Sequence, residues 1–93
     1  MMNITKDNNK SRYNIKVLGI GSSKYQQLTH NLFTVIKELD IDAEIEQYGE
    51  IEDFIRFNII EIPTIIIDGK VIAKGKILNI DTLKSFLISK SIA

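Results

Sequence analysis

The sequence predicts an α/β fold whose elements run β-α-β-α-β-β-α around a four-stranded mixed sheet. Three observations predict it. An apolar run at residues 13–18 leads into apolar positions that recur at helical spacing. The β-branched run at residues 65–67 is separated by Asp68-Gly69 from a second apolar run, which is a strong hairpin signal. A last helical period, around residues 80–87, predicts a closing helix.

The first half of the chain predicts a tail, a strand and a long helix. Residues 1–12 are polar and aperiodic, so we expect a mobile tail followed by a single domain over residues 13–93. Residues 13–18 are nearly all apolar, which suits a strand covered on both faces. After a glycine turn at residues 19–21, we expect a helix over residues 24–39. Its apolar positions are Tyr25, Leu28, Leu32, Val35, Ile36 and Leu39.

Local signals predict where the long helix begins and where the next strand and helix lie. Ser23 and Gln26 fit a capping box at the start of the long helix. Residues 43–48 alternate, which predicts a strand with one side near solvent. The acidic start at residues 50–53 predicts a short second helix, and Asn58 is placed to end it in a left-handed conformation.

The hairpin and the closing helix also carry local signals. Gly75 predicts a bulge or bend beyond the hairpin. Asn79 is suited to cap the closing helix. A crossover helix between the first two strands makes them parallel, and the hairpin adds an antiparallel pair. The residues that we expect this last helix to present to the core are Ile80, Leu83, Phe86 and Leu87.

Composition excludes several classes of function. The 12 basic and 12 acidic residues cancel, which argues against a nucleic-acid surface or a polybasic membrane patch. The chain has no cysteine, which excludes disulfides, thiolate catalysis and thiolate metal sites. The single histidine, His30, cannot form a metal cluster by itself. We therefore expect no metal, no cofactor, no nucleic acid and no membrane insertion, and a cytoplasmic location.

The turn between the first strand and the long helix is the place where chemistry is expected. Backbone N–H groups and the positive end of the helix dipole favour a nucleophile or an anion there. Ser22 has no identifiable base, since His30 lies two turns further along the helix, so no catalytic residue is predicted. An anion site would use Gly21, Ser22, Ser23 and Lys24, although their spacing matches neither a phosphate loop nor a dinucleotide fingerprint.

Four segments in this order resemble the thioredoxin fold, and more closely the thioredoxin-like family of small redox-active disulfide proteins. They are IKVLGIG at residues 15–21, ELDIDAE at residues 38–44, IPTIIIDGKV at residues 62–71, and Gly75-Lys76. The resemblance covers residues 13 to 88, and it implies a three-layer fold with the sheet in the middle.

The resemblance also implies a degenerate site. In that family the two glycines are followed by a Cys-x-x-Cys motif, whose cysteines fall on Ser22 and Tyr25 of this chain. A serine hydroxyl cannot form the mixed disulfide of thiol–disulfide exchange, so that activity is not carried over. By resemblance, Pro63 is a cis-proline and Ile62 offers its backbone to an extended peptide. Ser22, Tyr25, Ile62 and Pro63 would then border a shallow peptide groove.

Three functions follow as alternatives. The leading one is a redox-inactive module that binds a protein or peptide beside Pro63. The second is a small-molecule or anion binder, or an enzyme, that uses the helix N-terminus at Ser22–Lys24. The third is a structural homo-oligomer formed through an exposed sheet edge. Tyr25 itself is expected either as a core-facing aromatic residue or as an exposed binding anchor.

Overall fold

The computed structural model describes residues 12–92, which form the predicted series of strands and helices. The predicted tail lies outside the described residues apart from Arg12, which begins the first strand. The elements are β1 (Arg12–Leu18), α2 (Ser23–Leu39), β2 (Asp42–Tyr48), α3 (Ile51–Arg56), β3 (Thr64–Ile67), β4 (Lys70–Lys74) and α4 (Ile80–Ile92). The predicted order β-α-β-α-β-β-α is therefore confirmed.

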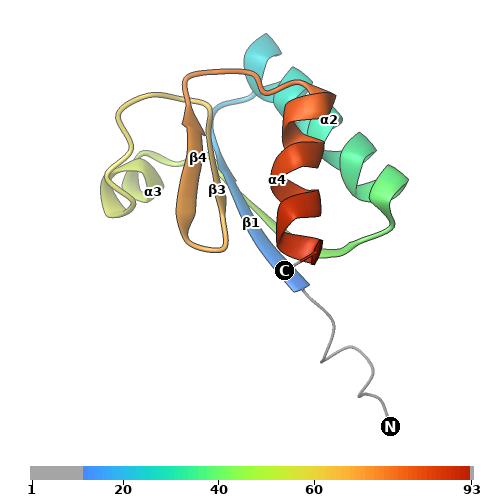
Figure 1. Ribbon diagram of the computed structural model, residues 1–93. Helices are drawn as coiled ribbons and strands as arrows, with labels where there is room; N and C mark the ends of the chain where they lie inside the picture. Colours follow the sequence, from blue (N-terminus) through green and yellow to red (C-terminus); the bar gives the residue numbers. More distant parts are fainter. Residues whose placement is uncertain (1–11, 93) are drawn as a thin grey trace, which may run out of the picture.

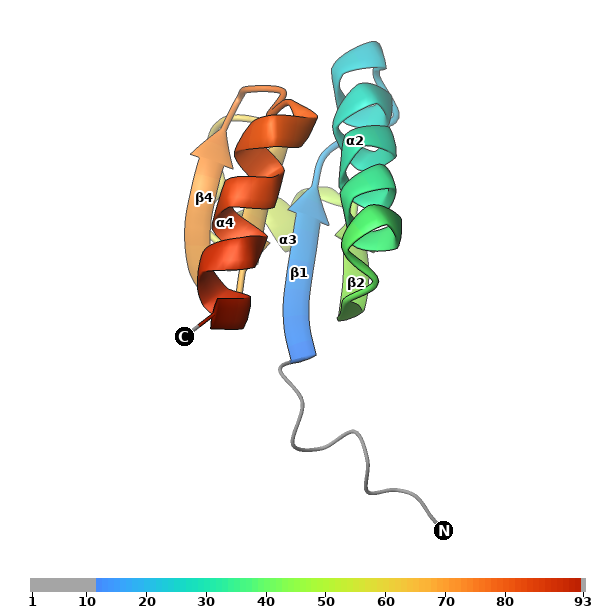
Figure 2. The same cartoon turned by 45° about the vertical axis from the view of Figure 1, so that its right-hand side comes forward.

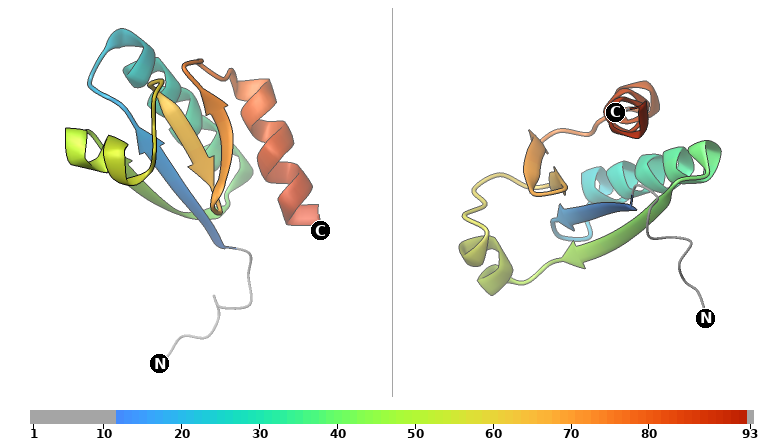
Figure 3. Two further views of the ribbon diagram at one scale, coloured as in Figure 1. Left: turned by 90° about the vertical axis from the view of Figure 1, so that its left-hand side faces the viewer. Right: turned by 60° about the horizontal axis from the view of Figure 1, so that its bottom comes forward.

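The strands form one mixed sheet in the order β2-β1-β3-β4. β1 pairs parallel with β2 and antiparallel with β3, and β3 pairs antiparallel with β4. This arrangement matches the predicted parallel first pair and antiparallel hairpin. α2 and α4 lie side by side over one face of the sheet, whereas α3 lies on the other side (Figure 1 and Figure 3). The fold thus has three layers.

The main core lies between the sheet and the helices α2 and α4. Alternate residues of β1 and β3 face these helices, because successive side chains of a strand point to opposite faces. The phenol of Tyr13 donates a hydrogen bond to the carbonyl of Leu87, which ties β1 to α4. The buried residues of this core are Tyr13, Ile15, Val17, Leu28, Leu32, Val35, Ile65, Ile67, Leu83 and Leu87.

The start of α2 corrects one prediction. The N-cap is Ser22, whose hydroxyl accepts a hydrogen bond from the Tyr25 N–H at 3.3 Å, whereas Ser23 is already the first residue of the helix. The backbone of Ser22 is extended, with φ −94° and ψ 174°, as an N-cap requires. Gln26 is consequently one position too far along the helix to complete the capping box predicted for Ser23.

The turns of the second half follow their local signals. Asn58 has a φ of 58°, as predicted for the residue that ends α3. In the hairpin, Asp68 and Gly69 have φ values of 51° and 83°, which match the primed turn that Asp-Gly favours. Gly75 has a φ of 67° just after β4, so it forms a bend. The bulge lies within β4 at Ile72, between the pairs Ile65–Ala73 and Ile66–Val71.

The closing helix α4 confirms its predicted cap but corrects one core residue. The side chain of Asn79 accepts a hydrogen bond from the Thr82 N–H at 2.8 Å. Leu83 and Leu87 are fully buried, whereas Phe86 is 41% exposed. At about 100° per residue, position 86 lies on the flank of the face defined by positions 83 and 87, and therefore points beyond the core.

Replacing Leu83 by alanine should lower the free energy of unfolding by about 2–5 kcal/mol, because it leaves a cavity where α4 packs on the sheet. Urea denaturation followed by circular dichroism measures this change. The matched control is Ile88→Ala on the exposed side of the same helix, which should cost far less. Equal costs for the two variants would contradict the assigned orientation of α4.

Candidate functional site

Strand pairing brings the glycine turn and Pro63 together. Leu18, the last residue of β1, is paired with Thr64, the first residue of β3. Because these strands are antiparallel, the residue after Leu18 lies beside the residue before Thr64. Gly19 is also fixed on its other side, where its N–H donates to the carbonyl of Tyr48 at 2.9 Å. The turn is therefore held between the end of β2 and the start of β3.

Gly19 lies very close to both the Tyr25 ring and Pro63. A Cβ atom added to Gly19 would lie 2.6 Å from Cδ1 of the Tyr25 ring and 3.4 Å from Cβ of Pro63. The first distance is far below van der Waals contact, so the absence of a side chain lets the ring approach the strand. The Ile62–Pro63 peptide bond is cis, and Pro63 is buried. The structure thus brings Tyr25 and Pro63 together around the position where a Gly19 side chain would be.

Tyr25 faces the interior at the position that resembles the second cysteine of the motif. Its side chain is partly buried and packs against the core. Burial raises the pKa of the Tyr25 hydroxyl above its usual value, and a hydrogen bond with the Gln47 side chain partly offsets that effect. The phenol therefore stays neutral at physiological pH. Of the two roles expected for Tyr25, the structure shows the core-facing one.

Ser22 is a helix cap in this structure. It is exposed, and its hydroxyl accepts the Tyr25 N–H described above. The hydrogen bonds that the structure gives for Ser22 are made with backbone groups, not with an imidazole or a carboxylate. His30 is exposed further along α2. Without a base beside it, the hydroxyl has no means of activation as a nucleophile.

The residues of the predicted anion site form an open turn. Gly21, Ser22, Ser23 and Lys24 are all exposed. The first turn of α2 contains no acidic residue that would neutralise the positive end of the helix dipole. These properties permit a weak electrostatic attraction for an anion, but the turn is not a closed pocket. The anion site stays a prediction.

Two exposed isoleucines, one in the turn and one next to Pro63, add apolar surface here. Ile20 is 59% exposed and Ile62 is 36% exposed. Within residues 12–92, the structure gives no hydrogen bond to the backbone N–H or C=O of Ile62. Sequence reasoning missed Ile20, although an apolar residue between two glycines of a turn is a signal for an exposed apolar side chain. The site therefore presents free backbone groups next to apolar surface.

Asp53, in the first turn of α3, is engaged in local contacts. The carboxylate of Asp53 accepts the N–H of Glu50 at 3.3 Å and pairs with Arg56 at 2.8 Å. In the part of the chain that the structure describes, no three His, Cys, Asp or Glu residues are grouped so as to hold a metal ion. None of its helices is long and apolar enough to cross a membrane.

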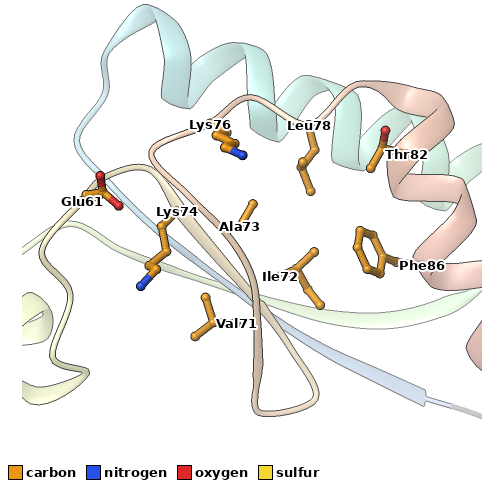
Figure 4. A pocket seen from close by; sticks show the side chains of 9 residues that line it. All are labelled: Glu61, Val71, Ile72, Ala73, Lys74, Lys76, Leu78, Thr82 and Phe86. Carbon is orange, nitrogen blue, oxygen red and sulfur yellow. The ribbon is translucent and has the colours of Figure 1, made fainter.

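A concavity of about 450 Å³ lies beside β4 (Figure 4). It includes Phe86, the residue that the sequence wrongly assigns to the core, together with apolar residues of β4. Its charged residues are Glu61, Lys74 and Lys76, and no histidine lines it. The full lining is Glu61, Val71, Ile72, Ala73, Lys74, Lys76, Leu78, Thr82 and Phe86. This concavity contains neither the glycine turn nor Pro63.

The contact at Gly19 can be tested by a double-mutant cycle. Gly19→Ala should lower the free energy of unfolding by about 1–3 kcal/mol, because the new methyl group forces the Tyr25 ring to move. In a Tyr25→Ala background the same substitution should cost clearly less, since the ring is gone. Urea denaturation of the wild type, both single variants and the double variant measures the coupling. Additive costs would contradict the described contact.

Comparisons with known proteins agree with this geometry. A family model described as "Thioredoxin domain" matches residues 13–88. A curated protein named thioredoxin, from Methanothermobacter thermautotrophicus, is 29% identical to this chain over 73 residues, which cover 78% of this chain and 95% of that protein. The resemblance stated from the sequence is thereby confirmed. The chain belongs to the thioredoxin domain family, although it contains no cysteine.

Proposed function

We propose that this protein is a redox-inactive thioredoxin-fold module that binds an extended segment of a partner protein beside Ile62 and Pro63. The observation that carries the proposal is the backbone of Ile62, which makes no hydrogen bond within residues 12–92. An extended peptide can satisfy such groups by adding as a short strand. Main-chain groups beside Pro63 recognise the extended segment, and side chains add apolar contact.

Exposed apolar side chains support binding at this place. Ile20 in the turn and Ile62 next to Pro63 are both exposed and would lose contact with water when a peptide covers them. The Tyr25 ring and Pro63 form the floor, since both lie against Gly19. Ser22 borders the groove as an exposed polar residue. The groove therefore combines a packed base with an apolar rim.

The lack of cysteine limits the chemistry of the site. Thiol–disulfide exchange needs a thiolate to attack and a second sulfur to resolve the mixed disulfide, and this chain supplies neither. The likeness to a protein named thioredoxin therefore supports the shape of the site and not its reaction. The alternatives of anion binding or an enzyme at Ser22–Lys24, and of a structural homo-oligomer, stay predictions. The cytoplasmic location also stays a prediction.

Affinity capture tests the proposal. Tagged wild-type protein should retain a specific partner from a lysate of the source cells, and Ile62→Asp should retain about tenfold less or none, because a buried carboxylate disfavours the interface. Ile77→Asp is a matched control, since Ile77 is also an exposed isoleucine but lies between β4 and α4. Circular dichroism verifies that both variants fold. Equal retention by all three proteins would contradict binding at Ile62.

The alignment of the degenerate motif is tested by restoring it. The double variant Ser22→Cys with Tyr25→Cys should form an intramolecular disulfide in air, because the N-cap and the third helical residue lie one turn apart. Mass spectrometry before and after reduction detects the loss of two hydrogens. Each single variant is a control that cannot close the bridge. A folded double variant that keeps both thiols under oxidising conditions would place the motif elsewhere.

A further inference from the structure

The two outer strands of the sheet differ in how well they resist pairing with another strand. β4 and β2 lie at opposite edges (Figure 2). β4 contains the bulge at Ile72, carries exposed lysines at both ends and is followed by the left-handed Gly75. Bulges and lysines are common devices that protect an edge strand. β2, in contrast, pairs with β1 along its whole length without a register shift.

The register of β2 shows which of its backbone groups face outward. The Gly19 N–H donates to the carbonyl of Tyr48, so that carbonyl points toward β1. Because backbone groups alternate along a strand, the N–H and C=O groups of Ala43, Ile45 and Gln47 point away from β1. In the sheet of residues 12–92 no further strand lies on that side. An added strand would meet three consecutive pairs of donors and acceptors.

The charged side chains of β2 are acidic, and they lie on the face of the sheet away from α2. Glu44 and Glu46 point to this face, since their register partners Asn14 and Lys16 alternate with core residues of β1. The Glu46 carboxylate accepts hydrogen bonds from the phenol of Tyr48 and from Asn14, and these bonds lower its pKa. Glu44 is exposed. The Lys16 ammonium also lies 3.8 Å from the Glu46 carboxylate, so Glu46 already has partners within the sheet. Glu44 is therefore the more accessible negative neighbour for the side chains of an added strand, and Glu46 adds negative charge beside it.

The other face of this edge is bordered by an apolar flank of α2. Tyr25 bonds to Gln47, so its side of α2 faces β2. Ile36 lies about 20° from Tyr25 around the helix, and Phe33 lies about 80° from it, further from the core. Ile36 is partly buried, whereas Phe33 is 48% exposed. Side chains of an added strand that point toward α2 would pack against this flank.

We infer that the β2 edge binds an extended segment of a partner protein whose residues alternate between apolar and basic. Its apolar side chains face Phe33 and Ile36 of α2, and its Lys or Arg side chains face Glu44 and Glu46. This surface is distinct from the groove beside Pro63.

A second copy of the chain is a poorer occupant of the same edge. If two β2 strands pair antiparallel about a two-fold axis at Ile45, Glu44 of one copy lies opposite Glu46 of the other, and this happens twice. Like charges directly opposite one another destabilise a pair of strands. The charges on β2 therefore favour a basic partner over self-association.

The test uses a synthetic fluorescein-labelled octapeptide of alternating valine and lysine. Fluorescence anisotropy measures its binding, and NMR measures amide hydrogen exchange at Ala43, Ile45 and Gln47. The peptide should bind saturably and slow exchange at these three amides by about tenfold or more. An octapeptide of alternating valine and glutamate, and one with valines and lysines in two blocks, are controls that should bind much more weakly. No binding, or slowed exchange on β4 instead, overturns the inference.

Variants of the protein identify the surface. Glu44→Lys should weaken binding of the valine–lysine peptide roughly tenfold and favour the valine–glutamate peptide, because it reverses an exposed charge. Lys74→Glu at the opposite edge is the matched control and should leave binding unchanged. Ile62→Asp should also leave it unchanged, which separates this surface from the Pro63 groove. Unaltered binding by Glu44→Lys, or dimerisation of the wild type in sedimentation, overturns the inference.

Discussion

The pairing of β1 on both of its sides is the constraint on which the rest of the structure depends. β1 lies in the middle of the sheet, and its residues Ile15, Val17 and Leu18 are fully buried. Its parallel pairing with β2 sets where the crossover through α2 must end. Its antiparallel pairing with β3 sets the position of the β3–β4 hairpin in the sheet. The same pairing aligns the last residue of β1 with Tyr48 and Thr64. The turn that follows β1 therefore has only one place to lie, between β2 and Pro63.

This constraint explains how the site keeps its shape without cysteine. Gly19 admits the Tyr25 ring next to Pro63, and the Ser22 hydroxyl caps the helix that the ring belongs to. Ser22 and Tyr25, which the resemblance places at the two motif positions, thus have structural roles that do not involve redox chemistry. What the fold retains is a backbone segment at Ile62 beside apolar side chains, which suits recognition of an extended chain.

Local signals in the sequence predict most of the fold, and the failures have physical causes. Asp68-Gly69, Asn58 and Asn79 each act through a preferred backbone conformation or a cap, so their roles follow from their identity. Ser22 and Ser23 are chemically identical, and only the extended backbone after Gly19 decides which one caps α2. Helical spacing groups Phe86 with Leu83, but the width of the buried stripe depends on how α4 packs, and that is a property of the tertiary structure.

The site was less predictable than the fold. The positions of Ser22, Tyr25, Ile62 and Pro63 followed from a family resemblance, because segments distant in sequence meet only through the sheet. The contact of Tyr25 with Gly19 depends on a ring orientation that no local pattern encodes. The exposed side chain of Ile20 and the difference between the β2 and β4 edges likewise required the tertiary structure.

Hydrogen exchange at the Ile62 amide tests most directly whether the backbone beside Pro63 is open for a partner. Two-dimensional NMR of the labelled protein measures this rate in the free state and with a captured partner segment at saturation. We expect exchange in the free protein near the rate of an unprotected peptide, and slower exchange in the complex. Strong protection in the free protein would show that an internal hydrogen bond already occupies this group, and would contradict peptide binding through the Ile62 backbone.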